Sequence, residues 1–135
     1  MNVVVIDGQG GRLGRELIAA VSARCPAAEV TAVGASSAAT AQMMKASPAH
    51  AATGENAVLV ACRRADVILG PIGIVIADAM LGEITPKMAQ AVGQSAAVRI
   101  LVPLNRCDNI VAGVSDVPLS QLVDDAAKRL AALDE

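Results

Sequence analysis

Four glycines, Gly8, Gly10, Gly11 and Gly14, come shortly after the apolar run Val3–Ile6. A turn at the start of a helix directs backbone N–H groups and the positive end of the helix dipole at one point, which favours anions. Glycines let a phosphate approach the backbone there. The spacing predicts that a nucleotide phosphate contacts the turn, although a turn that only packs helix on strand remains the alternative. The candidate residues are Gly8, Gln9, Gly10, Gly11, Arg12, Leu13 and Gly14.

Asp7 stands at the tip of the preceding strand, where a carboxylate would repel phosphate unless it is paired or neutralised. Hydrogen bonds to the loop amides or a helix cap are the favoured interpretations, and cation binding is the alternative. Thr53 and Glu55 open a later helix as a cap and a first-turn acid, or they face the ligand. Three scattered cysteines and the single His50 lack the spacing of a metal site, so no metal is expected.

Two further loops, Gly70–Gly73 and Asn105–Cys107, are expected to share the edge of the sheet with the glycine turn. Gly70, Pro71 and Gly73 form a second glycine turn that would approach a ribose. Asn105 and Arg106 would orient and clamp an anionic group, with a surface ion pair as the alternative for the arginine. Ser36 would bind a 2′-phosphate or, as is favoured, cap a helix. Cys107 is the weakest candidate, a thiol nucleophile activated by its neighbour.

The turn Gly8-Gln9-Gly10-Gly11-Arg12-Leu13-Gly14-Arg15 resembles the opening of dihydrodipicolinate reductases, in which a Gly-x-Gly-Gly-Arg-Met-Gly-Arg run binds the pyrophosphate of NAD(P)H. The resemblance covers the first strand, loop and helix. It implies NAD or NADP as the cofactor, and NAD(P)-dependent oxidoreduction as an activity to consider. Those reductases use a separate substrate domain, which is not expected here. No acid follows Val33 to read the ribose, so weak discrimination between NADH and NADPH is expected.

Alternating strands and helices predict the fold class: a three-layer α/β Rossmann-like fold, with a mostly parallel sheet of about five strands and helices on both faces. Residues 1–135 are expected to form one domain. Strands are expected at Val3–Ile6, Glu29–Gly34, Asp66–Gly70, Val98–Val102 and, at the edge, Ile110–Val114. Ser47–Ala52 is expected to be a loop. Helices are expected from the glycine turn to Cys25 and at Ala38–Ala46, Thr53–Arg64, Ile74–Leu81, from Pro86 onward and at Pro118–Leu133.

The composition limits the classes of partner that the chain is expected to bind. The chain has no aromatic residue, a net charge of −2 and no basic run, which argues against nucleic acid. Its longest uncharged apolar stretch, Val67–Ala77, is too short to span a bilayer, and no basic segment marks a signal peptide, so the cytoplasm is expected. The Ile74–Leu81 segment is apolar nearly all round, which predicts a homo-oligomer, most simply a dimer.

The whole chain also resembles an uncharacterised bacterial family catalogued as a domain of unknown function. The resemblance implies a Rossmann-like fold but no established activity, so a non-enzymatic nucleotide or anion sensor, or a partner subunit of an oligomer, remains the alternative function. The matching runs are Val5–Gly11, Ala52–Asn56, Gly70–Ile74, Met80–Pro86 and Pro103–Cys107.

Overall fold

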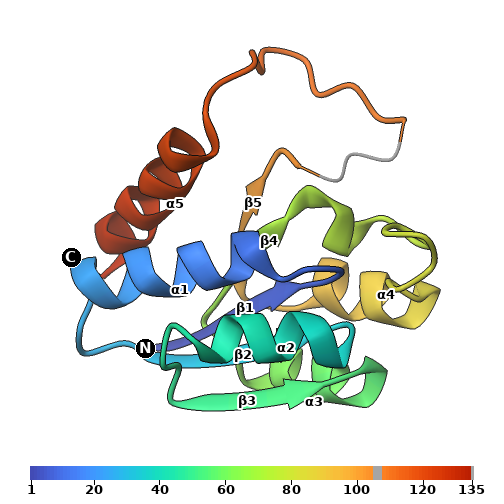
Figure 1. The fold of residues 1–135 in the computed structure, drawn as a ribbon, viewed down its shortest axis with the longest axis horizontal. Coiled ribbons are helices and arrows are strands. Elements are labelled where there is room, and N and C mark those ends of the chain that lie inside the picture. Colours follow the sequence, from blue (N-terminus) through green and yellow to red (C-terminus); the bar gives the residue numbers. More distant parts are fainter. Residues whose placement is uncertain (105–107, 135) are drawn as a thin grey trace.

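A five-stranded sheet forms the centre of the molecule in the computed structural model, which describes residues 1–104 and 108–134 (Figure 1). The strand order is β3-β2-β1-β4-β5, and every neighbouring pair is parallel. Unbroken apolar runs build the inner strands because both of their faces are covered. The strands are β1 Asn2–Asp7, β2 Glu29–Gly34, β3 His50–Thr53, β4 Val67–Pro71 and β5 Val98–Val102.

Helices cover both faces of the sheet (Figure 1). On one face lie α1 (Arg12–Arg24), α2 (Ser37–Met44) and α5 (Leu119–Leu133), over a core that includes Val3, Val5, Leu17, Met43 and Leu130. On the other lie α3 (Glu55–Arg64), the 3-10 helix η1 (Ile72–Val75) and α4 (Pro86–Gln94), over a core that includes Ile6, Val58, Ile68, Ile74 and Met88. These three layers confirm the expected Rossmann-like fold.

The order of the strands reverses beside β1. The chain moves outward from β1 to β2 and β3, then crosses the sheet through α3 to β4 and β5 on the other side of β1. In open parallel sheets, ligands bind beyond the carboxyl ends of the strands at such a reversal. The glycine turn after β1 and the Gly70–Gly73 turn at the end of β4 therefore meet where this topology places a ligand.

Two strand predictions are wrong. In place of the expected loop Ser47–Ala52 and the expected helix cap Thr53, residues His50–Thr53 form β3 and pair with Thr31–Gly34 of β2. It is a short edge strand with four exposed residues, so it carries no buried apolar pattern. Ile110–Val114, expected as an edge strand, is irregular, and the Ile110 side chain is 94% exposed. Although this segment is apolar, it pairs with no strand in the part of the chain that the structure describes.

The predicted helix Ile74–Leu81 is also wrong. After η1 the chain runs through turns, in which Asp78, Met80 and Leu81 adopt left-handed backbone conformations with φ of 68°, 57° and 58°. Single side chains of this segment, Ile74, Ala79 and Met80, are buried in the core beneath α4, whereas Leu81 is 98% exposed. Gly82 therefore ends no helix, and the apolar helix expected to form a dimer does not exist.

No helix of the described residues is long and apolar enough to cross a membrane.

Candidate functional site

Asp7 organises the glycine turn from inside. Its side chain is 3% exposed; its Oδ1 accepts the Gly8 amide at 2.8 Å and its Oδ2 accepts the Gly14 amide at 2.7 Å. Burial raises the pKa of this carboxyl, the two amides oppose that shift, and the nearby Glu83 adds to it. The interpretation of Asp7 as an acceptor for loop amides is confirmed.

Two amides in the first turn of α1 have no acceptor among the described residues. Gly11 is the N-cap, with φ of 73°, and has no capping side chain. The third amide of the helix, from Gly14, is held by Asp7, but within residues 1–104 and 108–134 no acceptor is found for the amides of Arg12 and Leu13. The turn contains no acid. Such uncapped amides at the positive end of a helix attract anions.

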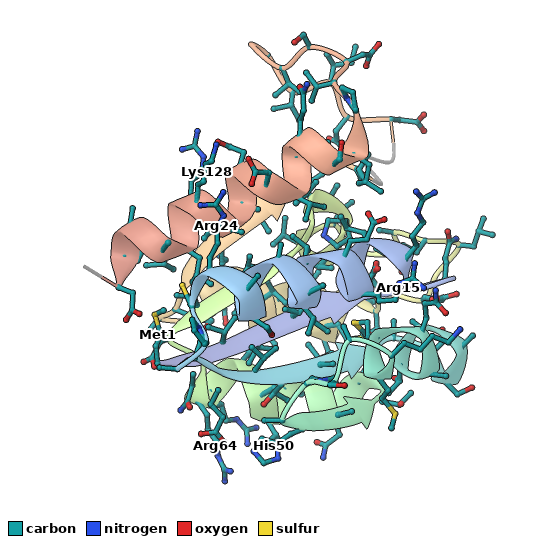
Figure 2. The ribbon with its side chains drawn as sticks, turned by 60° about the vertical axis from the view of Figure 1, so that its left-hand side comes forward. Met1, Arg15, Arg24, His50, Arg64 and Lys128 are labelled. Carbon is teal, nitrogen blue, oxygen red and sulfur yellow. The ribbon has the colours of Figure 1, made fainter. Side chains whose placement is uncertain are left out.

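Arginines add positive charge at this position. Arg12 is exposed and forms a loose ion pair with Glu16, with 3.5 Å between Nε and Oε1. Arg15 is half-buried and lies at the end of the molecule opposite Met1, close to the start of α1 (Figure 2). Basic residues in the first turn of a helix are unfavourable for its dipole, so their presence suits a site for an external anion.

The glycines serve different purposes. A Cβ at Gly11 would lie 2.5 Å from the Ala39 oxygen, and one at Gly14 would lie 2.5 Å from the Met43 sulfur, so both are required for packing against α2. A Cβ at Gly10 would meet no atom within 4 Å, and Gly10 is exposed. The packing explanation therefore accounts for Gly11 and Gly14, whereas nothing in the described structure excludes a side chain at Gly10.

The segment between η1 and α4 lies directly over the turn. Glu83 Oε1 accepts the Gln9 amide at 2.7 Å. The Met80 side chain is 4% exposed, and a Cβ placed on Gly8 would lie 2.5 Å from its sulfur. Sequence reasoning missed both residues because it assigned Met80 to a helix that does not form and gave Glu83 no role. The acid that follows Leu81-Gly82 was the available signal.

Other predicted site residues gather at the same edge. Ser36 accepts the Ala39 amide at 3.2 Å as the N-cap of α2, and its hydroxyl donates to the Gln9 carbonyl at 3.3 Å. Gly70, Pro71 and Gly73 are buried, and a Cβ on Gly70 would lie 2.4 Å from the Ile6 oxygen, so close strand packing requires this glycine. Asn105, Arg106 and Cys107 lie outside the described residues.

A second pair of polar residues joins the starts of α3 and α4. Thr85 caps α4, with Pro86 at its first position, as the sequence indicates. Its hydroxyl donates to Glu55 Oε2 at 2.5 Å. The expected cap of α3 is wrong: Gly54 takes that position without a side-chain cap, and the Thr53 hydroxyl instead lies 2.6 Å from that of Thr40. Glu55 thus ties the two helices together.

Within residues 1–104 and 108–134, no three histidine, cysteine or acidic residues gather in a way that could hold a metal ion. Cys25 and Cys62 are buried free thiols, and burial raises the pKa of Cys62 to about 11, so it stays protonated at neutral pH. His50 Nε2 lies 2.7 Å from Glu29 Oε1 on the exposed edge strand. The contacts of these cysteines and of the histidine are those of structural residues and indicate no metal or catalytic site.

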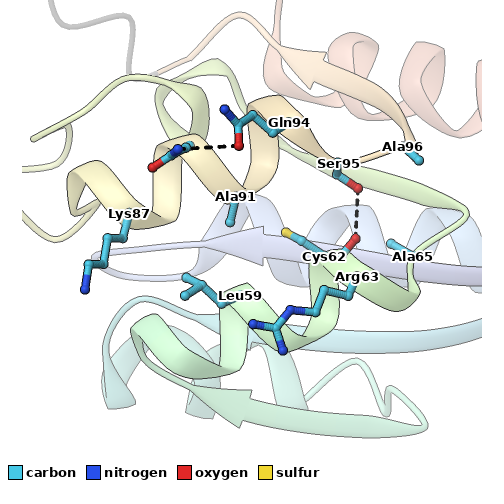
Figure 3. A pocket seen from close by; sticks show the side chains of 10 residues that line it. Leu59, Cys62, Arg63, Ala65, Lys87, Ala91, Gln94, Ser95 and Ala96 are labelled. Atoms are coloured by element: carbon cyan, nitrogen blue, oxygen red, sulfur yellow. Dashed lines mark hydrogen bonds between the residues drawn. The ribbon is translucent and has the colours of Figure 1, made fainter.

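A groove of about 600 Å³ lies between α3 and α4 (Figure 3). Arg63 and Lys87 lie along it, and the Ser95 hydroxyl donates to the Cys62 carbonyl at 2.8 Å within it. The groove shares no residue with the glycine turn, and its cations are ordinary surface side chains. The converging loops, rather than this groove, form the candidate site.

No curated protein matches the chain. Among solved structures, it is similar to a dodecameric FMN-dependent Ubix-like decarboxylase from Escherichia coli O157:H7, with 18% identity, a TM-score of 0.49, and coverage of 96% of this chain and 76% of that one. The model of a family described as a domain of unknown function, DUF3842, matches residues 2–135, and the chain therefore belongs to that family.

Proposed function

We propose that this protein binds a nucleotide at the start of α1, with a phosphate on the backbone amides between Gln9 and Leu13. The observation that carries the proposal is the uncapped first turn: Asp7 holds the Gly14 amide, while those of Arg12 and Leu13 have no acceptor among the described residues. Arg12 and Arg15 would balance the charge of the phosphate. The reversal of strand order beside β1 supports the same position.

A pyridine dinucleotide, NAD or NADP, is the first candidate ligand. The glycine turn supports it through its likeness to the pyrophosphate loop of the reductases named above, and Gly70, Pro71 and Gly73 border the position where a ribose would lie. A bound nicotinamide would supply hydride chemistry, and this chain would bind and orient it. A sensor that binds the nucleotide without turnover is the alternative, and any substrate pocket would need a second copy or another protein.

Replacing Gly10 with valine should weaken nucleotide binding at least about tenfold, or about 1.4 kcal/mol, because the side chain would occupy the path of the phosphate. The fold should persist, since no atom lies within 4 Å of the added Cβ. Titration calorimetry with NADH and NADPH, together with mass spectrometry of nucleotides that co-purify, measures the effect. Gly93→Val in α4, where a Cβ also meets nothing, is the matched control. Equal affinity of the Gly10 variant and wild type would contradict the proposal.

We also propose that two copies associate along β5. The sheet ends at this strand, so its outer edge has no partner among the described strands. Beside it lies a groove of about 750 Å³ between β5 and α5, lined by four exposed apolar side chains: Val98, Val114, Val117 and Leu133. Two copies related by a two-fold axis can pair their β5 edges in antiparallel fashion. This pairing would bring the apolar grooves of both copies together and bury them.

Sedimentation equilibrium at micromolar concentration should show a dimer. Val98→Lys combined with Leu133→Lys should raise the dissociation constant at least about tenfold, because both charges would enter the interface. Leu81→Lys is the control: this side chain is 98% exposed but belongs to the segment over the glycine turn, so the dimer should persist. A monomeric wild type, or equal effects of both changes, would refute association through β5.

A further inference from the structure

A carboxylate of the chain itself binds the glycine turn. Glu83 Oε1 accepts the Gln9 amide at 2.7 Å across a separation of 74 residues. Among the described residues Glu83 pairs with no cation, so a backbone amide is its recorded partner. An anion held by loop amides is the interaction that the turn would offer to a phosphate.

The contact brings a second carboxyl group close to Asp7. Glu83 raises the pKa of the Asp7 carboxyl, in addition to the larger effect of burial. A Cβ on Gly8 would lie 2.9 Å from Glu83 Oε1 and 2.5 Å from the Met80 sulfur, which shows how closely both side chains cover this part of the turn. A phosphate placed on the Gln9 amide would meet the Glu83 carboxylate at the same position.

The segment that carries Glu83 has a strained backbone. Asp78, Met80 and Leu81 have left-handed φ values of 68°, 57° and 58°. Non-glycine residues pay for this conformation, and it tends to occur at switch segments. Both ends of the segment are anchored: the Asp78 amide donates to the Ile84 carbonyl at 2.7 Å, and Ile84 is fully buried. Rotation of the Glu83 side chain away from Gln9 would break this contact while Met80 and Ile84 stay buried in the core.

We propose that the Glu83 carboxylate is an internal anion, which occupies the Gln9 amide in competition with an anionic group of the ligand and is displaced when the ligand binds. The inference rests on the proposed function, because it concerns the same turn. It assigns to Glu83 the control of affinity: the carboxylate lowers the affinity of the turn for phosphate and turns away from the Gln9 amide when phosphate takes its place.

Glu83→Gln tests this directly, because the amide keeps the shape of the side chain and an oxygen for Gln9 but loses the charge. Calorimetric titration with NADH and with inorganic pyrophosphate should show at least about tenfold tighter binding than wild type, as expected when a charge-assisted competitor is removed. Glu55→Gln is the matched control: it removes the same charge at the same sheet edge, but from a residue that holds Thr85. Its affinities should stay within about threefold of wild type.

Amide NMR gives a readout that does not depend on affinity. The Gln9 amide resonance should shift in Glu83→Gln and when pyrophosphate is added to wild type, because both change its acceptor. If wild type binds NADH and Glu83→Gln binds it equally or more weakly, the internal-anion inference is overturned while the proposed function stands. If neither protein binds NADH or pyrophosphate, both are overturned. A Gln9 amide that does not respond to bound pyrophosphate also overturns the displacement.

Discussion

Replacing Gly11 with alanine should lower the free energy of unfolding by about 3 kcal/mol, the combined cost of a left-handed backbone and an overpacked contact. Gly11 has φ of 73°, and a Cβ there would lie 2.5 Å from the oxygen and 2.8 Å from the Cα of Ala39. Both neighbouring atoms belong to the backbone of α2, which cannot rotate away as a side chain can. Urea denaturation followed by circular dichroism measures the loss.

Gly10→Ala is the control for this effect. Its Cβ would meet no atom within 4 Å, and its backbone is not left-handed, so the free energy of unfolding should change by less than about 1 kcal/mol. Equal destabilisation by the two alanines would show that the packing of α1 against α2 does not set the requirement for Gly11.

The two substitutions distinguish a glycine required for packing from one that packing does not require, which the spacing of the glycines alone cannot do. A pattern of glycines shows where a side chain is not accommodated, but not whether backbone, neighbouring side chain or ligand excludes it. In this turn the backbone of α2 excludes a side chain at Gly11, and the Met43 side chain excludes one at Gly14. Nothing in the described structure excludes a side chain at Gly10. Binding experiments with variants at Gly11 would therefore confuse loss of the fold with loss of the site.

Most of the fold could be predicted because its elements carry strong local signals. The apolar runs of β1, β2, β4 and β5, the amphipathic face of α5, and the Thr85-Pro86 start of α4 all occur where the sequence indicates. β3 was missed because a four-residue, alanine-rich edge strand has no pattern of its own. Its position is set by pairing with β2, which is a tertiary interaction.

The segment over the glycine turn shows a different limit. Its apolar residues suggest a helix, but Met80 packs on Gly8 and Glu83 binds Gln9. Contacts with residues more than 70 positions earlier stabilise left-handed conformations that local propensity disfavours. The bond from Asp7 to Gly14, in contrast, spans seven positions at the end of a strand, and the sequence was sufficient to suggest it.

Asp7→Ala should lower the free energy of unfolding by about 3 kcal/mol, because it leaves the amides of Gly8 and Gly14 buried without an acceptor. Asp66→Ala is the matched control. Asp66 Oδ2 also accepts a backbone amide, that of Asn2 at 2.7 Å, but this bond is exposed and water can replace it. Its substitution should cost less than half as much, and an equal loss would show that burial does not set the importance of Asp7.

The same carboxyl should make stability depend on pH in an unusual direction. Burial holds the pKa of Asp7 above its ordinary value of 3.8, so the folded protein binds this proton more strongly than the unfolded chain does. The stability that this proton contributes is complete below the unfolded pKa and is lost as the pH rises through the folded pKa. Asp7→Asn cannot ionise and loses nothing in that range. The unfolding free energy of wild type minus that of Asp7→Asn should therefore fall as the pH rises above the ordinary carboxyl pKa of 3.8. A difference that rises instead would mean that the Gly8 and Gly14 amides outweigh burial and hold the carboxylate ionised.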